Sequence, residues 1–106
     1  MNFQERFPPT DEIWMYSNPL KAQQNAFRDY GRDAILYRSK AKNKKYAIIN
    51  PIGKIINFGQ MGMEDYLKHK DEYRRMKYNL RSEGIRGRWR EDGYSANNLS
   101  RNLLWT

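Results

Sequence analysis

The sequence contains no cysteine, only one histidine and no long run of apolar residues. Without cysteine the chain can form neither a disulfide framework nor a thiolate metal site. Its first residues lack the apolar stretch of a signal peptide. No segment approaches the roughly 20 apolar residues that cross a bilayer. These absences predict a protein of a reducing compartment, neither secreted nor bound to a membrane.

Recognisable catalytic sites are missing as well. His69 has no second histidine with which to bind a metal, and no Gly-rich phosphate loop of the Walker or dinucleotide type is present. His69-Lys70-Asp71 has the letters of a phosphodiesterase motif, but adjacent side chains on a helix diverge by about 100°. Glu64 and Asp65 diverge in the same way. We therefore expect a protein that is not an enzyme and that has no catalytic residue, metal, cofactor or small-molecule substrate.

What the sequence does contain is aromatic side chains and positive charge. Aromatic residues make up 14% of the 106 residues, which is enough for one thin core. The net charge is +8. A polyanion is the natural partner of such a chain, with nucleic acid first and an acidic protein surface second.

Turn and cap residues predict an α+β fold. Residues 1–16 read as an extended arm, and residues 17–106 as a single domain. A first helix is expected from the Asn18-Pro19 cap to about Tyr30, with Gly31 as its stop. A strand pattern follows at 34–37.

A β-hairpin is predicted over 46–58, because Pro51 and Gly53 suit the two special positions of its turn. The expected sheet is antiparallel, with two or three strands. A last short helix, capped by Ser95, ends at Trp105. This apolar C-terminus docks either on the chain's own sheet or in a groove of another subunit, and self-docking is the better interpretation because a small core needs the area.

One long amphipathic helix is expected from about 63 to 82, packed across the sheet. At 100° per residue its buried face is predicted to hold Tyr66, Tyr73, Met76 and Leu80. The neighbouring stripe aligns four cations, Lys70, Arg74, Lys77 and Arg81. A cationic row can follow a phosphate backbone; alternatively the row is a solvated flank that pairs with nearby acids.

Two further basic segments are candidates for polyanion binding. The first is a loop or strand-edge segment that contains Arg38, Lys40, Lys42, Lys44 and Lys45, and it is either a phosphate clamp or a solubilising loop. The second segment contains Arg86, Arg88, Trp89 and Arg90, so that three guanidinium groups surround one indole. Its indole either stacks on a base or folds back onto the core, and the core role is favoured.

The arm offers aromatic side chains that can anchor on a partner. These candidate anchors are Phe3, Phe7 and Trp14.

Short motifs between residues 36 and 105 form a recognisable series: Lys44-Lys45-Tyr46, Asn50-Pro51, Gly53-Lys54, Phe58-Gly59, Glu64-Asp65-Tyr66, His69-Lys70-Asp71, Arg74-Arg75, Tyr78, Trp89, Tyr94 to Ser100 and Leu103-Leu104-Trp105. Together they resemble a family of small uncharacterised basic proteins encoded by nucleocytoplasmic large DNA viruses. The family pattern differs at Met63, Leu67 and Ala96, where it often has an aromatic residue, threonine and proline. The first third of the chain is not covered. The resemblance implies no catalytic residue, but it does imply a setting in a virion or in the host cytoplasm or nucleus.

Two functions fit these features. The leading hypothesis is a virion-associated minor capsid or cement protein that bridges larger viral structural proteins through its arm and basic faces. The alternative is a basic nucleic-acid-binding protein that contacts the phosphate backbone through residues 38–45, 70–81 and 86–90. A cement protein has a partly disordered arm when alone, whereas a nucleic-acid binder has a folded core and a steeply salt-dependent affinity.

Overall fold

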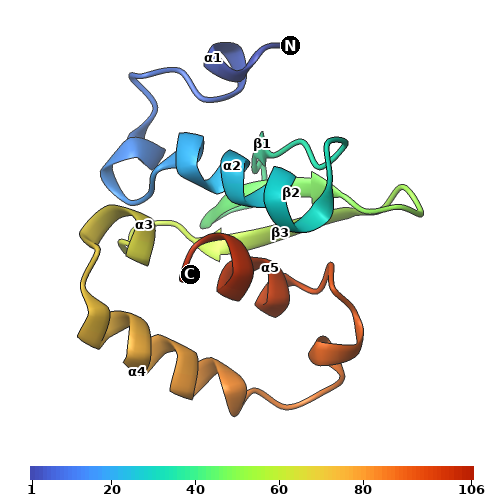
Figure 1. Ribbon diagram of the computed structural model, residues 1–106. Coiled ribbons are helices and arrows are strands. Elements are labelled where there is room, and N and C mark those ends of the chain that lie inside the picture. Colours follow the sequence, from blue (N-terminus) through green and yellow to red (C-terminus); the bar gives the residue numbers. More distant parts are fainter.

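The computed structural model describes residues 1–106 as a three-stranded antiparallel sheet and five α-helices (Figure 1). The expected α+β class is confirmed. The elements run in the order α1 (Phe3–Arg6), η1 (Glu12–Met15, a 3-10 helix), α2 (Pro19–Tyr30), β1 (Tyr37–Arg38), β2 (Lys44–Ile49), β3 (Ile55–Gln60), α3 (Tyr66–His69), α4 (Glu72–Glu83), η2 (Trp89–Glu91, a 3-10 helix) and α5 (Ala96–Leu103).

The sheet has the order β1-β2-β3, with β2 in the centre. The predicted hairpin is confirmed, and its register runs from Lys44 opposite Gln60 to Ile49 opposite Ile55. In the turn, the Asn50 carboxamide oxygen accepts the Lys54 backbone N–H at 2.8 Å, and Gly53 takes a φ of 83° that disfavours other residues. The expected strand at 34–37 is reduced to two residues, Tyr37 and Arg38.

Helices α2 and α5 pack against each other, and α5 also packs on β3 (Figure 1). The caps of both helices were predicted. Asn18 caps α2 by accepting from Lys21 N–H with Pro19 in the first turn, and Ser95 caps α5 by accepting from Asn98 N–H. The C-terminal Leu103 and Leu104 are fully buried in the chain's own core, so the self-docking interpretation is confirmed.

The first sixteen residues form a folded segment rather than an extended arm. Phe7 is only 1% exposed and lies edge-on against Tyr46 of the sheet, with ring centroids 5.6 Å apart. Trp14 packs beside Phe3 and donates its indole N–H to the Pro8 carbonyl at 3.0 Å. The prediction that Phe7 anchors on a partner is therefore wrong, and Phe3 and Trp14 also pack against the chain's own core. A thin core recruits these rings because each buries a large apolar area.

The helix expected over 63–82 is present in two pieces. Lys70 adopts a left-handed φ of 55° and ends α3. Asp71 then caps α4, because its carboxylate accepts the backbone N–H groups of Tyr73 and Arg74 at 2.9 and 3.2 Å. The break turns α4 away from the axis of α3. None of the helices is both long enough and apolar enough to span a bilayer.

Because Phe7 fills the core, Phe7→Ala is expected to lower the free energy of unfolding by about 3–5 kcal/mol. Phe3→Ala, at a partly exposed position of the same segment, serves as the control and is expected to cost much less. Urea denaturation followed by circular dichroism measures both. Equal and small losses for the two variants would show that the first sixteen residues do not belong to the core.

Candidate anion-binding groove

A groove of about 630 Å³ lies between α4, α5 and the end of β3. Its floor is apolar and includes Phe58, Leu104 and Trp105. Gly59 also lines it; its φ is 81°, and an added Cβ would lie 3.0 Å from Leu104 Cδ1 and 3.2 Å from Lys45 Cβ. A glycine here therefore lets α5 approach the sheet closely. The lining of the groove also carries four cations, Lys44, Arg74, Lys77 and Arg81, and one carboxylate, Glu64.

Helix α4 forms one wall of the groove, and it is attached to the body through Tyr78, Asn79 and Ser82. The Tyr78 ring stacks on Trp105 with centroids 4.1 Å apart and planes 7° from parallel. Arg101 of α5 donates to the Asn79 carbonyl at 2.9 Å and to the Ser82 hydroxyl. Ser82 is only 2% exposed. Stacking and polar contacts, rather than an aliphatic seam, therefore hold this helix.

This attachment turns the predicted apolar face outward. Tyr73, Met76 and Leu80 are 63%, 51% and 65% exposed, so the prediction that they form the buried face of the helix is wrong. Periodicity identifies which residues share a face, but the stack on Trp105 and the bonds from Arg101 decide which face meets the protein. As a consequence the cationic stripe borders the groove.

Three of the four predicted stripe cations, Arg74, Lys77 and Arg81, come together at the groove. Lys70 does not, because it lies at the α3–α4 break, beside a smaller hollow that Asn18 and Lys21 also line.

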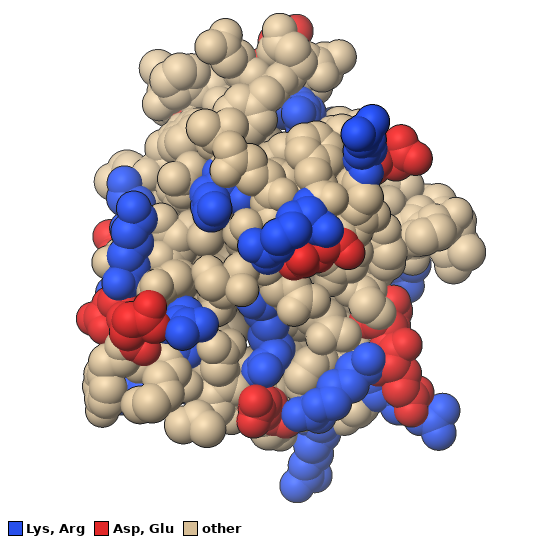
Figure 2. Space-filling model, in the orientation of Figure 1, with Lys and Arg blue, Asp and Glu red and all other residues tan.

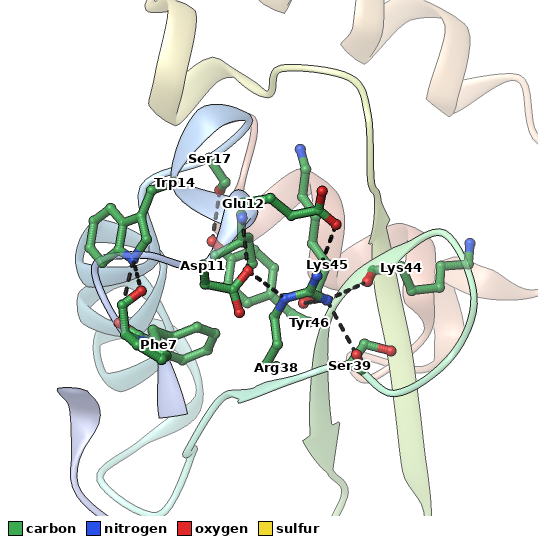
Figure 3. A network of polar contacts seen from close by, with 12 residues as sticks. Phe7, Asp11, Glu12, Trp14, Ser17, Arg38, Ser39, Lys44, Lys45 and Tyr46 are labelled. Carbon is green, nitrogen blue, oxygen red and sulfur yellow. Dashed lines mark hydrogen bonds and ion pairs between the residues drawn. The ribbon is translucent and has the colours of Figure 1, made fainter. Parts of the chain in front are cut away.

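The basic segment 38–45 divides into residues with different roles (Figure 3). Lys44 lines the groove, and Lys40 and Lys42 are exposed in the loop. Arg38 is partly buried, pairs with Asp11 at 3.2 Å and donates to the Lys44 carbonyl at 3.1 Å. Lys45 is 2% exposed. A polyanion-binding role for Lys45 is therefore wrong, and Arg38 is engaged by its own chain.

Lys45 forms a buried ion pair with Asp65, with Nζ and Oδ2 3.1 Å apart. The same ammonium group also donates to the backbone carbonyls of Tyr16 and Met63 at 3.1 and 2.7 Å. Burial lowers the pKa of Lys45 and raises that of Asp65, whereas the charge of each partner opposes the shift of the other. The strand position of Lys45 gave no sign of this partner, which lies twenty residues away in the sequence.

Trp89 is partly buried against its own chain but lies outside the hydrophobic core, so the favoured interpretation that it folds back onto the core is wrong. The Arg90 and Arg101 guanidinium groups lie 4.1 and 5.4 Å from its ring centroid, and its indole N–H donates to the Ile85 carbonyl at 2.8 Å. These contacts oppose a role for Trp89 in base stacking. Arg86 and Arg88 are exposed and do not line the groove.

The cations of the groove have few acidic partners. No carboxylate lies within 4.0 Å of the charged groups of Lys44, Lys77 or Arg81, and Arg74 has only Glu64, at 3.9 Å and about half exposed. Such exposed pairs are worth little. Figure 2 shows Lys and Arg side chains spread over most of this face of the molecule, with Asp and Glu side chains among them. No group of three His, Asp or Glu side chains is arranged to hold a metal ion.

The fold and the site together define a small α+β protein whose groove has an apolar floor and several cations along its edge. Residues 34–82 match a family of unknown function (DUF5754), which is less than half of the chain. This segment contains the Lys45–Asp65 pair and the four cations Lys44, Arg74, Lys77 and Arg81. No curated protein and no solved structure matches the chain.

The α3–α4 junction is expected to make stability depend on pH. His69 Nδ1 accepts the Asp71 backbone N–H at 2.9 Å, a bond that protonation of Nδ1 would break. Burial, and then the charge of Arg74, lower the pKa of His69 below its ordinary 6.5. The unfolded chain therefore takes up this proton first, so the free energy of unfolding should fall as the pH drops from about 7 to about 5.

Urea denaturation across this range measures the effect. His69→Asn retains an acceptor but does not titrate, so its stability should change less with pH over the same interval. An unchanged slope in the variant would contradict the assignment.

Proposed function

We propose that the protein binds nucleic acid and that the groove receives the phosphate backbone. The observation that carries this proposal is the convergence of Lys44, Lys77 and Arg81 on one hollow in which none of the three forms an ion pair, since Glu64, which also lines it, pairs with Arg74. Charged helix faces usually pair with acids on the same helix, whereas these cations border a concave surface. The net charge of +8 favours encounter with any polyanion.

The contacts available in the groove suit phosphate rather than bases. Each cation that meets a phosphate releases condensed counterions, which makes affinity strongly dependent on salt. The aromatic pair at the floor offers no free ring face for a base, because Tyr78 stacks on Trp105 and Arg81 lies 5.7 Å from the Tyr78 centroid, while His69 lies against Trp105. We therefore propose binding with little preference for base sequence.

Fluorescence anisotropy with a labelled oligonucleotide, between about 50 and 200 mM salt, tests the proposal. Lys44→Gln, Lys77→Gln and Arg81→Gln are combined in one variant, which should bind far more weakly and reduce the slope of log K against log salt by about 3. Circular dichroism shows whether this variant keeps its fold.

A matched control removes the same charge elsewhere. Lys40→Gln, Lys42→Gln and Arg86→Gln change three exposed cations outside the groove, and this variant should lose only a small part of the affinity. Equal losses in the two variants would mean that net charge, not the groove, holds the nucleic acid. Affinity that neither triple changes would exclude a role for these cations.

A second candidate is a structural protein that joins larger subunits of a virus particle. The exposed apolar face of α4, with Tyr73, Met76 and Leu80, favours it, since exposed apolar surface is typical of protein contacts. The folded N-terminal segment no longer supports it, because Phe7 is buried. The viral setting for either function rests on the motif resemblance between residues 36 and 105.

A further inference from the structure

The four cations along the groove come from two separate elements. Helix α4 contributes Arg74, Lys77 and Arg81, and the sheet contributes Lys44 at the start of β2. At 100° per residue the three α4 cations lie within about 60° of one another, and at 1.5 Å per residue they extend over about 10 Å of the helix axis. One nucleic-acid strand carries a phosphate about every 3.4 Å along its axis, so this row matches about three successive phosphates of one strand.

The groove is narrow in relation to its length. Its lining on the α4 side runs from Arg74 to Ile85, which is roughly 15 Å at the rise of a helix. Spread over roughly that length, the volume of about 630 Å³ corresponds to a channel roughly 6 Å across. A DNA duplex is wider than its own major groove, which is about 12 Å wide. A duplex therefore meets only the outer edge of the groove, whereas one strand enters it.

The floor of the groove favours the same form of nucleic acid. Met63 and Ile85 are 56% and 48% exposed, and Ala96 and Leu104 also line the hollow. An unpaired strand presents the apolar surface of its sugars and bases to this floor, and the removal of apolar surface from water is favourable. In a duplex the bases are stacked and paired, so the floor would stay in contact with water. Aliphatic contacts of this kind read no base sequence, in agreement with the proposed binding of the backbone.

Net charge alone would select the opposite ligand. A duplex carries one charge about every 1.7 Å of its axis, whereas a single strand carries one about every 3.4 Å. A protein that bound only through its charge of +8 would therefore prefer the duplex. A preference for the single strand has to come from the shape and the apolar floor of the groove.

We infer that the groove holds a short stretch of single-stranded nucleic acid, about three nucleotides long, in preference to a duplex. Lys44 approaches this strand from the sheet and the row of α4 cations approaches it from the helix, while the sugars and bases cover the floor between Met63 and Ile85. This inference rests on the proposed function and names the form of nucleic acid that the groove accepts.

Fluorescence anisotropy at about 100 mM salt compares a labelled single-stranded DNA of about 12 nucleotides with the duplex of the same sequence. The single strand should bind about tenfold more tightly than the duplex, because only the single strand covers the apolar floor. A single-stranded RNA of the same sequence should bind within about threefold of the DNA strand, since none of the inferred contacts is made to the 2′-hydroxyl group.

Met63→Ser and Ile85→Ser, combined in one variant, test the floor. This variant should bind the single strand about tenfold more weakly and should bind the duplex as the unchanged protein does. Met76→Ser with Leu80→Ser is the matched control, because these two side chains are about as exposed but lie on α4 outside the groove. The control should keep the preference for the single strand, and circular dichroism shows that both variants are folded.

The inference and the proposed function fail in different ways. If the duplex binds as tightly as the single strand, and the variant that lacks Lys44, Lys77 and Arg81 still loses affinity, the inference is overturned and the proposed function stands. If neither form binds, both are overturned. Equal losses in the floor variant and its control, or strict selectivity between the RNA and the DNA strand, would also overturn the inference.

Discussion

The buried ion pair between Lys45 and Asp65 is the contact on which the arrangement of this protein depends. Both side chains are at most 2% exposed, and a buried charge is costly unless it is paired and hydrogen-bonded. The Lys45 ammonium group meets this requirement with Asp65 and with the carbonyls of Tyr16 and Met63. One side chain thereby joins the N-terminal segment, the central strand and the connection from β3 to α3.

The groove follows from this junction. Asp65 immediately precedes α3, so the pair fixes where the α3–α4 segment leaves the sheet. The other end of α4 is fixed by Arg101 and Trp105, which come from the C-terminal part of the chain. Helix α4 is held at both ends and makes few apolar contacts, and it lies beside the sheet and α5. Its cations therefore border the groove, and its apolar side chains are exposed to solvent. The cationic edge of the groove results from how the helix is attached.

The features that could be predicted from sequence depend on neighbours a few residues away. Asn18 and Ser95 cap their helices, and Pro51 and Gly53 shape the hairpin turn, because each acts on backbone within four residues. Phe7, Lys45 and Tyr78 have partners far along the chain. Local pattern therefore predicted a partner anchor at Phe7 and a polyanion-binding cation at Lys45, and gave no sign that Tyr78 stacks on Trp105. The break at Asp71 is a local feature that the sequence analysis missed. An aspartate inside a predicted helix can cap a new helix, so its presence there indicates that the span is divided in two.

The most direct test of this account is a double-mutant cycle on the pair, measured by urea denaturation of Lys45→Met, Asp65→Leu and the combined variant. Each single change leaves a buried charge without its partner, and should cost about 3–5 kcal/mol or unfold the chain, whereas the double variant removes both charges and should fold with much of the stability restored. Single changes that cost under about 1 kcal/mol, or costs that simply add in the double variant, would contradict the central role of the pair.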